Sequence, residues 1–83
     1  MDSKLWTLNH LLTQFGQRIR ELRLAQGISQ EQLAEKTGFH RTYIGMIERG
    51  ERNLSLANIG TLAKYFEMSV SELLDFENKR GES

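Results

Sequence analysis

The sequence contains no cysteine and no proline among its 83 residues, a length that suits one domain. Without cysteine, the chain has neither disulfide bonds nor a thiolate metal site. No apolar run approaches the ~20 residues that a membrane-spanning helix needs. Residues 1–12 carry one lysine and no small-residue cleavage site, so they do not resemble a secretory signal. We therefore expect a cytoplasmic protein without a membrane partner.

Side chains that serve in catalysis are also scarce. The only histidines are His10 and His40, and no glycine-rich phosphate loop is present. His10 has no recognisable metal partner, and no paired carboxylates occur in a context that resembles a pocket. We expect a protein that is not an enzyme and that binds no cofactor, metal ion or small-molecule ligand.

The formal net charge is zero, which by itself argues against a nucleic-acid partner. The charges are unevenly distributed, however. Residues 1–26 carry four basic and two acidic side chains, whereas residues 66–83 carry two basic and five acidic ones. A molecule of this kind could turn a basic face toward DNA and keep its acidic end away. Ordinary solvated charges are the alternative interpretation.

Apolar residues recur at helical spacing along the whole chain, and β-branched alternation is absent. The first helix carries one apolar stripe, formed by Leu8, Leu12, Phe15, Ile19 and Leu22. Its start is open, with Thr7 or Asn9 as alternative caps of an early beginning, and Gly27 ends it. The pattern predicts five helices, at about 9–26, 30–37, 41–49, 56–66 and 71–76.

Three of the later helix starts have the spacing of a capping box, in which a hydroxyl and a residue three positions on satisfy free N–H groups. The pairs are Ser29 with Gln32, Ser69 with Glu72, and more weakly Ser55 with Asn58. Short connections between such helices favour a compact all-α bundle. We expect an extension over 1–12, a domain over 13–76 and a flexible tail over 77–83.

Residues 30–49 predict two short helices around Gly38. Ala34 is small where the two helices cross closely, and Gly38 permits the sharp turn that sets the crossing near a right angle. Alanine, glycine four positions later and isoleucine six positions after that is the spacing of a helix-turn-helix. The inward-facing residues are Leu33, Ala34, Ile44 and Ile47.

Over about residues 13–76 the chain resembles the Xre/Cro-like helix-turn-helix regulators of phages and bacteria. The motifs that carry this resemblance are Ile-Arg-Glu-Leu-Arg (19–23), Gly-Ile-Ser-Gln-Glu-Gln-Leu-Ala (27–34) and Tyr-Ile-Gly-Met-Ile-Glu-Arg-Gly (43–50). The stretch 41–55 is similar to the controller proteins of restriction-modification systems. The resemblance implies a compact lambda-repressor-like domain that binds a double-stranded DNA operator and regulates transcription.

The second helix of the motif is expected to enter the major groove. Arg41 is the first candidate to read a base, because a guanidinium bonds N7 and O6 of guanine together. Thr42 and Met46 would contact base edges or thymine methyl groups, and Gly45, facing outward, would allow close approach. The alternatives are a phosphate contact or solvation for Arg41, helix initiation for Thr42, tight helix packing for Gly45 and soft surface for Met46.

Phosphate contacts are expected around this helix from the positive end of the preceding helix, from polar side chains and from the following loop. The alternatives are capping for His40, a core position for Tyr43 and plain solvation for the loop. The candidate residues are Ser29, Gln30, His40, Tyr43, Arg49, Arg52 and Asn53.

The resemblance also implies an ion pair between Arg23 in the first helix and Glu48 at the end of the second motif helix. Such a pair, partly buried, would fix one helix against the other. Its role would be structural.

One short helix reads too few bases for gene-level specificity, so we expect a homodimer with its reading helices ~34 Å apart. Closure of the monomer core by the same residues is the alternative. The expected interface residues are Tyr65, Phe66, Met68, Val70, Leu73 and Phe76.

RNA polymerase is a further candidate partner of such a regulator. Other functions that fit the sequence are a phage-type repressor, an antitoxin-like regulator and a protein-interaction module that binds no DNA.

Overall fold

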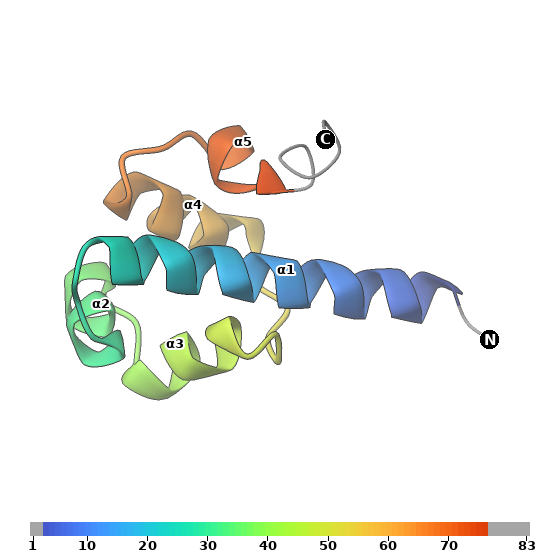
Figure 1. Ribbon diagram of the computed structural model, residues 1–83, viewed down its shortest axis with the longest axis horizontal. Helices are drawn as coiled ribbons and strands as arrows, with labels where there is room; N and C mark the ends of the chain where they lie inside the picture. The colour runs from blue at the N-terminus through green and yellow to red at the C-terminus, as the bar shows by residue number, and fades with distance from the viewer. Residues whose placement is uncertain (1–2, 77–83) are drawn as a thin grey trace.

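The computed structural model describes residues 3–76, and its side chains from residue 7 onward. Five helices follow one another and no strand occurs in this range (Figure 1), which confirms the all-α prediction. The helices are α1 (Ser3–Ala25), α2 (Gln30–Thr37), α3 (Arg41–Glu48), α4 (Leu56–Tyr65) and α5 (Val70–Leu73).

α1 is longer than predicted, because it begins at Ser3 rather than near residue 9. Residues 3–12 contain neither glycine nor proline, so nothing in the sequence interrupts the helix there. Neither Thr7 nor Asn9 therefore starts it. Its first turns extend beyond the rest of the fold (Figure 1). No described helix is long and apolar enough to cross a bilayer. The predicted tail at 77–83 lies outside the described residues.

The predicted helix caps form as hydrogen-bonded pairs. The Ser29 hydroxyl accepts from the Gln32 N–H at 3.0 Å, and the Gln32 side chain accepts from the Ser29 N–H at 2.8 Å. The same reciprocal pair joins Ser69 and Glu72. Ser55 accepts one such bond without a reciprocal partner, so its box is incomplete. Local chemistry therefore sets where three of the five helices begin.

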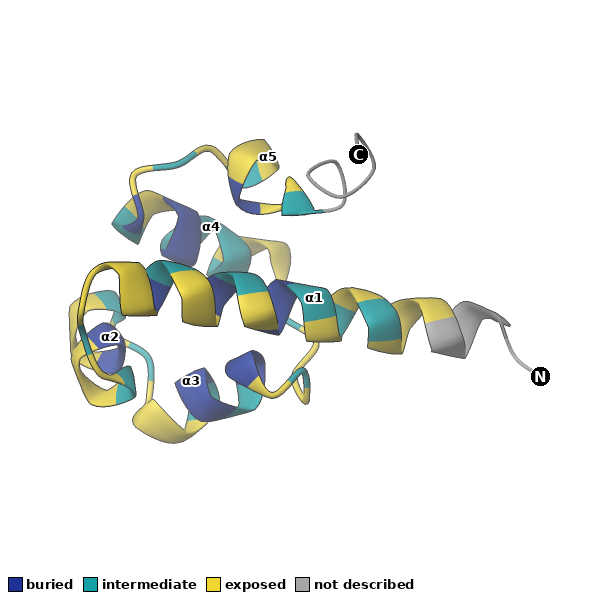
Figure 2. Ribbon diagram, viewed as in Figure 1, coloured by how far each residue is buried: buried dark blue, intermediate teal, exposed yellow. Residues whose placement is uncertain are grey.

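The core lies where all five helices meet, and Figure 2 shows their buried sides turned toward one another. The predicted stripe of α1 is buried at Phe15 and Ile19 but exposed at Leu8, beyond the edge of the core. All four inward-facing residues predicted for the motif are buried. The core residues are Phe15, Ile19, Leu33, Ala34, Ile44, Ile47, Leu62, Ala63, Phe66 and Leu73.

Two residues of α1 that the sequence did not single out hold other helices in place. A Cβ at Gly16 would clash with the backbone carbonyl oxygens of Ile47 and Glu48, so only glycine allows α1 to lie directly on the last turn of α3. Arg18 donates hydrogen bonds to the carbonyl oxygens of Glu72 and Leu73, at 2.8 and 3.1 Å. These bonds satisfy carbonyl groups at the end of α5 that a helix leaves without internal partners.

Candidate nucleic-acid interface

α2 and α3 form the predicted helix-turn-helix. Gly38 ends α2 in the left-handed region, with φ 84°, where L side chains are strained. Its N–H donates to the Ala34 carbonyl at 2.8 Å, which closes the last turn. Phe39 and His40 then lead directly into α3.

The outward side of α3 faces solvent at its first turn (Figure 2). Arg41 and Thr42 are exposed there, and Met46, one turn later, is half-buried. The inward side packs into the core through Ile44 and Ile47, which are at most 1% exposed. The first turn of the surface that the sequence predicted to read DNA is therefore accessible.

Gly45 differs from the expectation of an open position, because it is buried. Its cover is not another helix, which was the alternative, but the ends of long polar side chains. A Cβ built at Gly45 would lie 3.2 Å from Arg49 Nη1, 3.6 Å from Arg41 Nη1 and 3.8 Å from Gln30 Oε1. Because Gly45 has no side chain, the ends of Gln30, Arg41 and Arg49 have room to approach one another. All three residues are candidates for DNA contacts.

Arg23 and Glu48 form the expected ion pair. Arg23 donates from Nε to Glu48 Oε2 at 2.6 Å and from Nη2 to Glu48 Oε1 at 2.9 Å, and the two side chains are 8% and 2% exposed. A third bond, from Arg23 Nη1 to the Ile28 carbonyl, anchors the guanidinium to the loop before α2. The hydrogen bonds to Glu48 raise the pKa of Arg23 above its ordinary value.

Gln30 joins this pair, which the sequence did not reveal. Its Nε2 donates to Glu48 Oε1 at 3.0 Å. One carboxylate therefore binds side chains from α1 and α2 while belonging to α3. The amide of Gln30 is oriented by that bond, with its oxygen on the side of Gly45.

Tyr43 is half-buried against the core, and its phosphate contact stays a prediction. Its half-buried ring packs edge-on against Phe39, with ring centroids 5.0 Å apart, and the Arg52 guanidinium lies 5.4 Å from its centroid. Its hydroxyl accepts from Asn58 Nδ2 at 2.9 Å, so the hydroxyl proton is left to donate elsewhere. Asn58, which the sequence suggested only as a capping partner of Ser55, thus also holds the hydroxyl in position.

His40 occupies the N-cap of α3 with an extended backbone, but its side chain makes no capping hydrogen bond. The alternative of a capping imidazole is wrong, because the exposed ring does not bond the backbone of the first turn. The Ser29 hydroxyl oxygen accepts a hydrogen bond from the Gln32 N–H, so this hydroxyl caps α2. The first backbone N–H groups of α2 have no partner within the helix itself.

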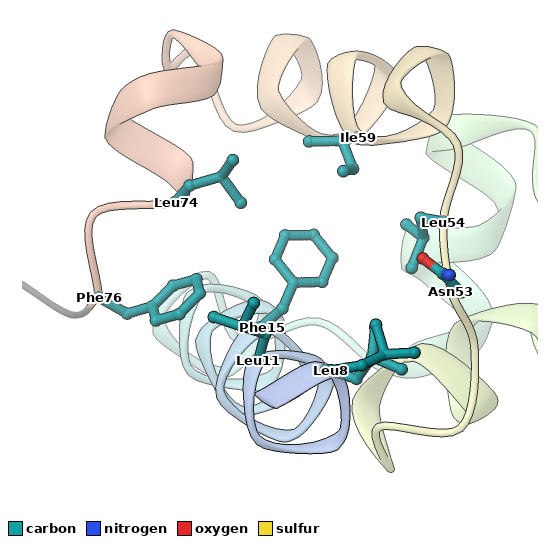
Figure 3. Close-up of a pocket in the computed structure, with 9 residues that line it drawn as sticks. Leu8, Leu11, Phe15, Asn53, Leu54, Ile59, Leu74 and Phe76 are labelled. Carbon is teal, nitrogen blue, oxygen red and sulfur yellow. The ribbon is translucent and has the colours of Figure 1, made fainter. Parts of the chain in front are cut away.

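In the loop after α3, the charge of Arg49 is paired with a carboxylate. Arg49 donates from Nε to Glu51 at 3.0 Å, and both side chains are exposed. The hydrogen bond and charge of Glu51 raise the pKa of Arg49. An exposed ion pair of this kind is weak in water. Glu51 would therefore be only a weak competitor of another anion that binds Arg49. Asn53 is exposed and lines an apolar groove together with Leu54 (Figure 3).

Two residues of the expected dimer interface already lie in the core of their own chain, which was the alternative interpretation. Leu73 is fully buried and Phe66 is 9% exposed in the core of their own chain, because so small a domain needs them to close it. Met68 and Val70 are half-buried and also pack against that core. Tyr65 donates its hydroxyl proton to Gln26. Phe76 lines the apolar groove next to Asn53.

Comparison with known proteins agrees with this geometry. A helix-turn-helix family model matches residues 19–73. The control protein C.BamHI of Bacillus amyloliquefaciens is 46% identical over 69 residues, which are 82% of this chain and 85% of that protein.

Among solved structures, the restriction-modification controller protein C.AhdI of Aeromonas hydrophila is 53% identical, with a TM-score of 0.70 over 75% of this chain and 94% of that one. The controller protein C.Esp1396I, solved as a tetramer with its natural 35-base-pair operator, is 39% identical with a TM-score of 0.68 over 77% of this chain and 88% of that one. The chain belongs to the helix-turn-helix family and, within it, to the group of restriction-modification controller proteins.

Proposed function

We propose that the chain is a transcriptional regulator that binds a double-stranded DNA operator as a dimer, with α3 in the major groove. The observation that carries this proposal is the outward face of α3. Arg41 and Thr42 are exposed at its start, and the ends of Gln30 and Arg49 converge beside Arg41 over Gly45. A rigid helix with polar donors on its free face is the arrangement that reads base edges.

Arg41 is proposed to select guanine through two parallel hydrogen bonds, which is worth ~1–3 kcal/mol against a wrong base. Among the described residues, none forms a hydrogen bond or ion pair with the Arg41 guanidinium, so DNA would not have to displace one. Thr42 and the half-buried Met46 would add contacts to base edges and thymine methyl groups. Gly45 would serve indirectly, by leaving room for the guanidinium groups.

Phosphate contacts are proposed to set the register of the helix in the groove. The N-terminal end of α2, with Ser29 and Gln30, would face one strand. The Tyr43 hydroxyl, held by Asn58, would donate to a phosphate oxygen, as would His40. Positive charge from the loop would flank this contact through Arg49 and Arg52, with Asn53 beside them.

We infer that the target is an operator that controls restriction-modification genes. The support is the relationship to C.BamHI and C.AhdI, and the fact that C.Esp1396I was solved on its own operator. RNA polymerase is the further partner that we propose for such a regulator.

Selection of randomised duplexes by the purified chain, followed by sequencing, tests the proposal. We expect one enriched motif with two-fold symmetry. The affinity for the enriched duplex should fall steeply, by a factor of about a thousand, between about 50 and 200 mM salt. Enrichment of no motif, or an affinity that ignores salt, would contradict the proposal.

A further inference from the structure

A polar hollow of about 530 Å³ lies between the last turns of α2 and α4, and its size falls in the range of small-molecule sites. None of the residues that we propose to contact DNA lines this hollow. A ligand held there would therefore leave the outward face of α3 free. The lining residues are Lys36, Thr37, Thr61, Lys64, Tyr65 and Glu67.

Two positive charges from different helices meet at this hollow. Lys36 belongs to the last turn of α2 and Lys64 to the last turn of α4. Among the residues that the structure describes, none forms a hydrogen bond or ion pair with either ammonium group. Helix dipoles favour a lysine at each of these ends, so the two charges need a second observation before they indicate a ligand.

Glu67 provides that observation, because the backbone and the helix dipole both disfavour it. Among the described residues other than glycine, only Glu67 has a positive φ, 59°, in the region that favours glycine. It also follows the C-terminal end of α4, where the dipole disfavours a carboxylate. Gly38 ends α2 in the same region without either cost. Within the described chain the Glu67 carboxylate has no bonding partner, so strain kept at this residue points to a ligand.

The hydroxyl groups of the hollow offer oxygen atoms, rather than protons, to a ligand. Thr37 and Thr61 donate their protons to backbone carbonyls of their own helices, at 2.8 and 3.2 Å, and Tyr65 donates to the Gln26 side chain. A hydroxyl that donates in this way still accepts a hydrogen bond. The hollow therefore combines two ammonium donors with a carboxylate and three hydroxyl oxygens that accept.

This combination favours a ligand that carries both a phosphate and several N–H or O–H donors. Two lysines and one glutamate leave one net positive charge, so the ligand should bring an excess of negative charge, which a phosphate between the lysines supplies. The acceptors of the hollow then call for donors such as those of a ribose and a base edge. Tyr65 adds an aromatic ring, on which a base can stack.

We propose that the hollow between α2 and α4 binds a nucleoside monophosphate. Its phosphate lies between Lys36 and Lys64, and its ribose or base donates to Glu67. The proposal goes beyond the proposed function and departs from the expectation of a chain without a small-molecule ligand. Because Thr37 directly precedes Gly38, the bound nucleotide would contact the segment that leads into α3.

Isothermal titration calorimetry of the full chain without DNA tests the site with the 5′-monophosphates of adenosine, guanosine, cytidine and uridine. We expect at least one of them to bind with a Kd below about 1 mM, and inorganic phosphate to bind at least about tenfold more weakly. Lys64→Ala should weaken the nucleotide at least about tenfold. Arg20→Ala is the matched control, since it removes one positive charge from an exposed residue outside the hollow and should leave the affinity unchanged.

Glu67→Gly separates a binding role from a merely structural one. It removes both the backbone strain and the disfavoured charge, so the melting temperature should rise while the affinity for the nucleotide falls. A residue with a structural role alone would not move these two readouts in opposite directions. Thermal unfolding also checks that Lys64→Ala and Arg20→Ala remain folded.

Four results would overturn the proposal. They are the absence of binding by all four nucleotides, inorganic phosphate that binds as tightly as a nucleotide, equal effects of Lys64→Ala and Arg20→Ala, and a Glu67→Gly chain that keeps its nucleotide affinity. Since none of these measurements contains DNA, their failure is distinguishable from a failure of the operator selection.

Discussion

The two ends of α3 are built in opposite ways. At its start, Arg41 and Thr42 are exposed, and the N-cap residue His40 makes no capping bond. At its end, Glu48 is buried, bonded to Arg23 and Gln30, and pressed against α1. One end is left to meet a ligand while the other fixes the direction of the helix. The comparison teaches that, in the proposed DNA-binding role, affinity and positioning would be carried by different residues of one short helix.

Removing the carboxylate at the fixed end should have the largest effect. Glu48→Ala leaves the guanidinium of Arg23 buried without its counter-charge, and we expect a loss of about 3–5 kcal/mol in the free energy of unfolding. Urea denaturation followed by circular dichroism measures it. Glu51→Ala is the control, because it removes an exposed carboxylate with an exposed partner and should change stability very little. Equal effects of the two variants would show that burial of the pair contributes nothing.

Glycine-to-alanine exchanges test the contact between α1 and the end of α3. Gly16→Ala drives a methyl group into the backbone of α3 and should cost about 1–3 kcal/mol of stability. Gly60→Ala adds the same group inside α4, where it meets nothing within 4 Å, and should stabilise the chain by up to about 1 kcal/mol. Thermal unfolding should move in opposite directions for the two variants. A stable Gly16→Ala chain would mean that the helices separate at little cost.

At the free end, Arg41→Ala should leave stability unchanged and reduce discrimination among duplexes. We expect a loss of about 1–3 kcal/mol on the selected operator and a smaller loss on duplexes that lack its guanine. Fluorescence anisotropy with both duplexes measures the difference. Arg52→Ala, which removes a charge predicted to contact phosphate, should weaken both duplexes alike. If Arg41→Ala also weakens them alike, Arg41 holds phosphate and reads no base.

The smallest effect is expected at Gly45, between the two ends. An added methyl group would press on the tip of the Arg49 side chain at 3.2 Å, which is flexible enough to shift. Gly45→Ala should therefore keep or raise stability by up to about 1 kcal/mol, through better helix propensity. Operator affinity should fall modestly, because the three polar ends lose their common space. Anisotropy titrations that match the unaltered chain would remove Gly45 from the site.

Features set by neighbouring residues were predictable from the sequence. The reciprocal caps at Ser29 and Ser69, the turn at Gly38 and the inward Ile44 and Ile47 depend on spacings within a few positions, and all are confirmed. The Arg23–Glu48 pair lies 25 positions apart and was predicted only through resemblance to a family.

Features that depend on packing between distant segments were missed. The burial of Gly45 could not be predicted, because it depends on where the ends of three long side chains lie. The burial of Phe66 and Leu73 depends on how much apolar surface the whole domain must close. Gly16 did leave a signal, since a glycine inside a predicted helix costs about 1 kcal/mol and calls for a reason such as close approach. The bonds of Arg18 to the end of α5 and of the Asn58 side chain to Tyr43 left no signal in the sequence.

The carboxylate of Glu48 joins α1, α2 and α3 at one point that faces away from solvent. The side-chain contacts of Glu48 thus hold the three helices together, and the side chains of Arg41, Thr42 and Met46 take no part in them. If these three residues read the operator as we propose, exchanging them would change the sequence that is recognised, while the contacts of Glu48 stay in place. Related regulators could thus acquire new operators by substitutions on the outward face of α3 alone, while the contacts of Glu48 with Arg23 and Gln30 are kept.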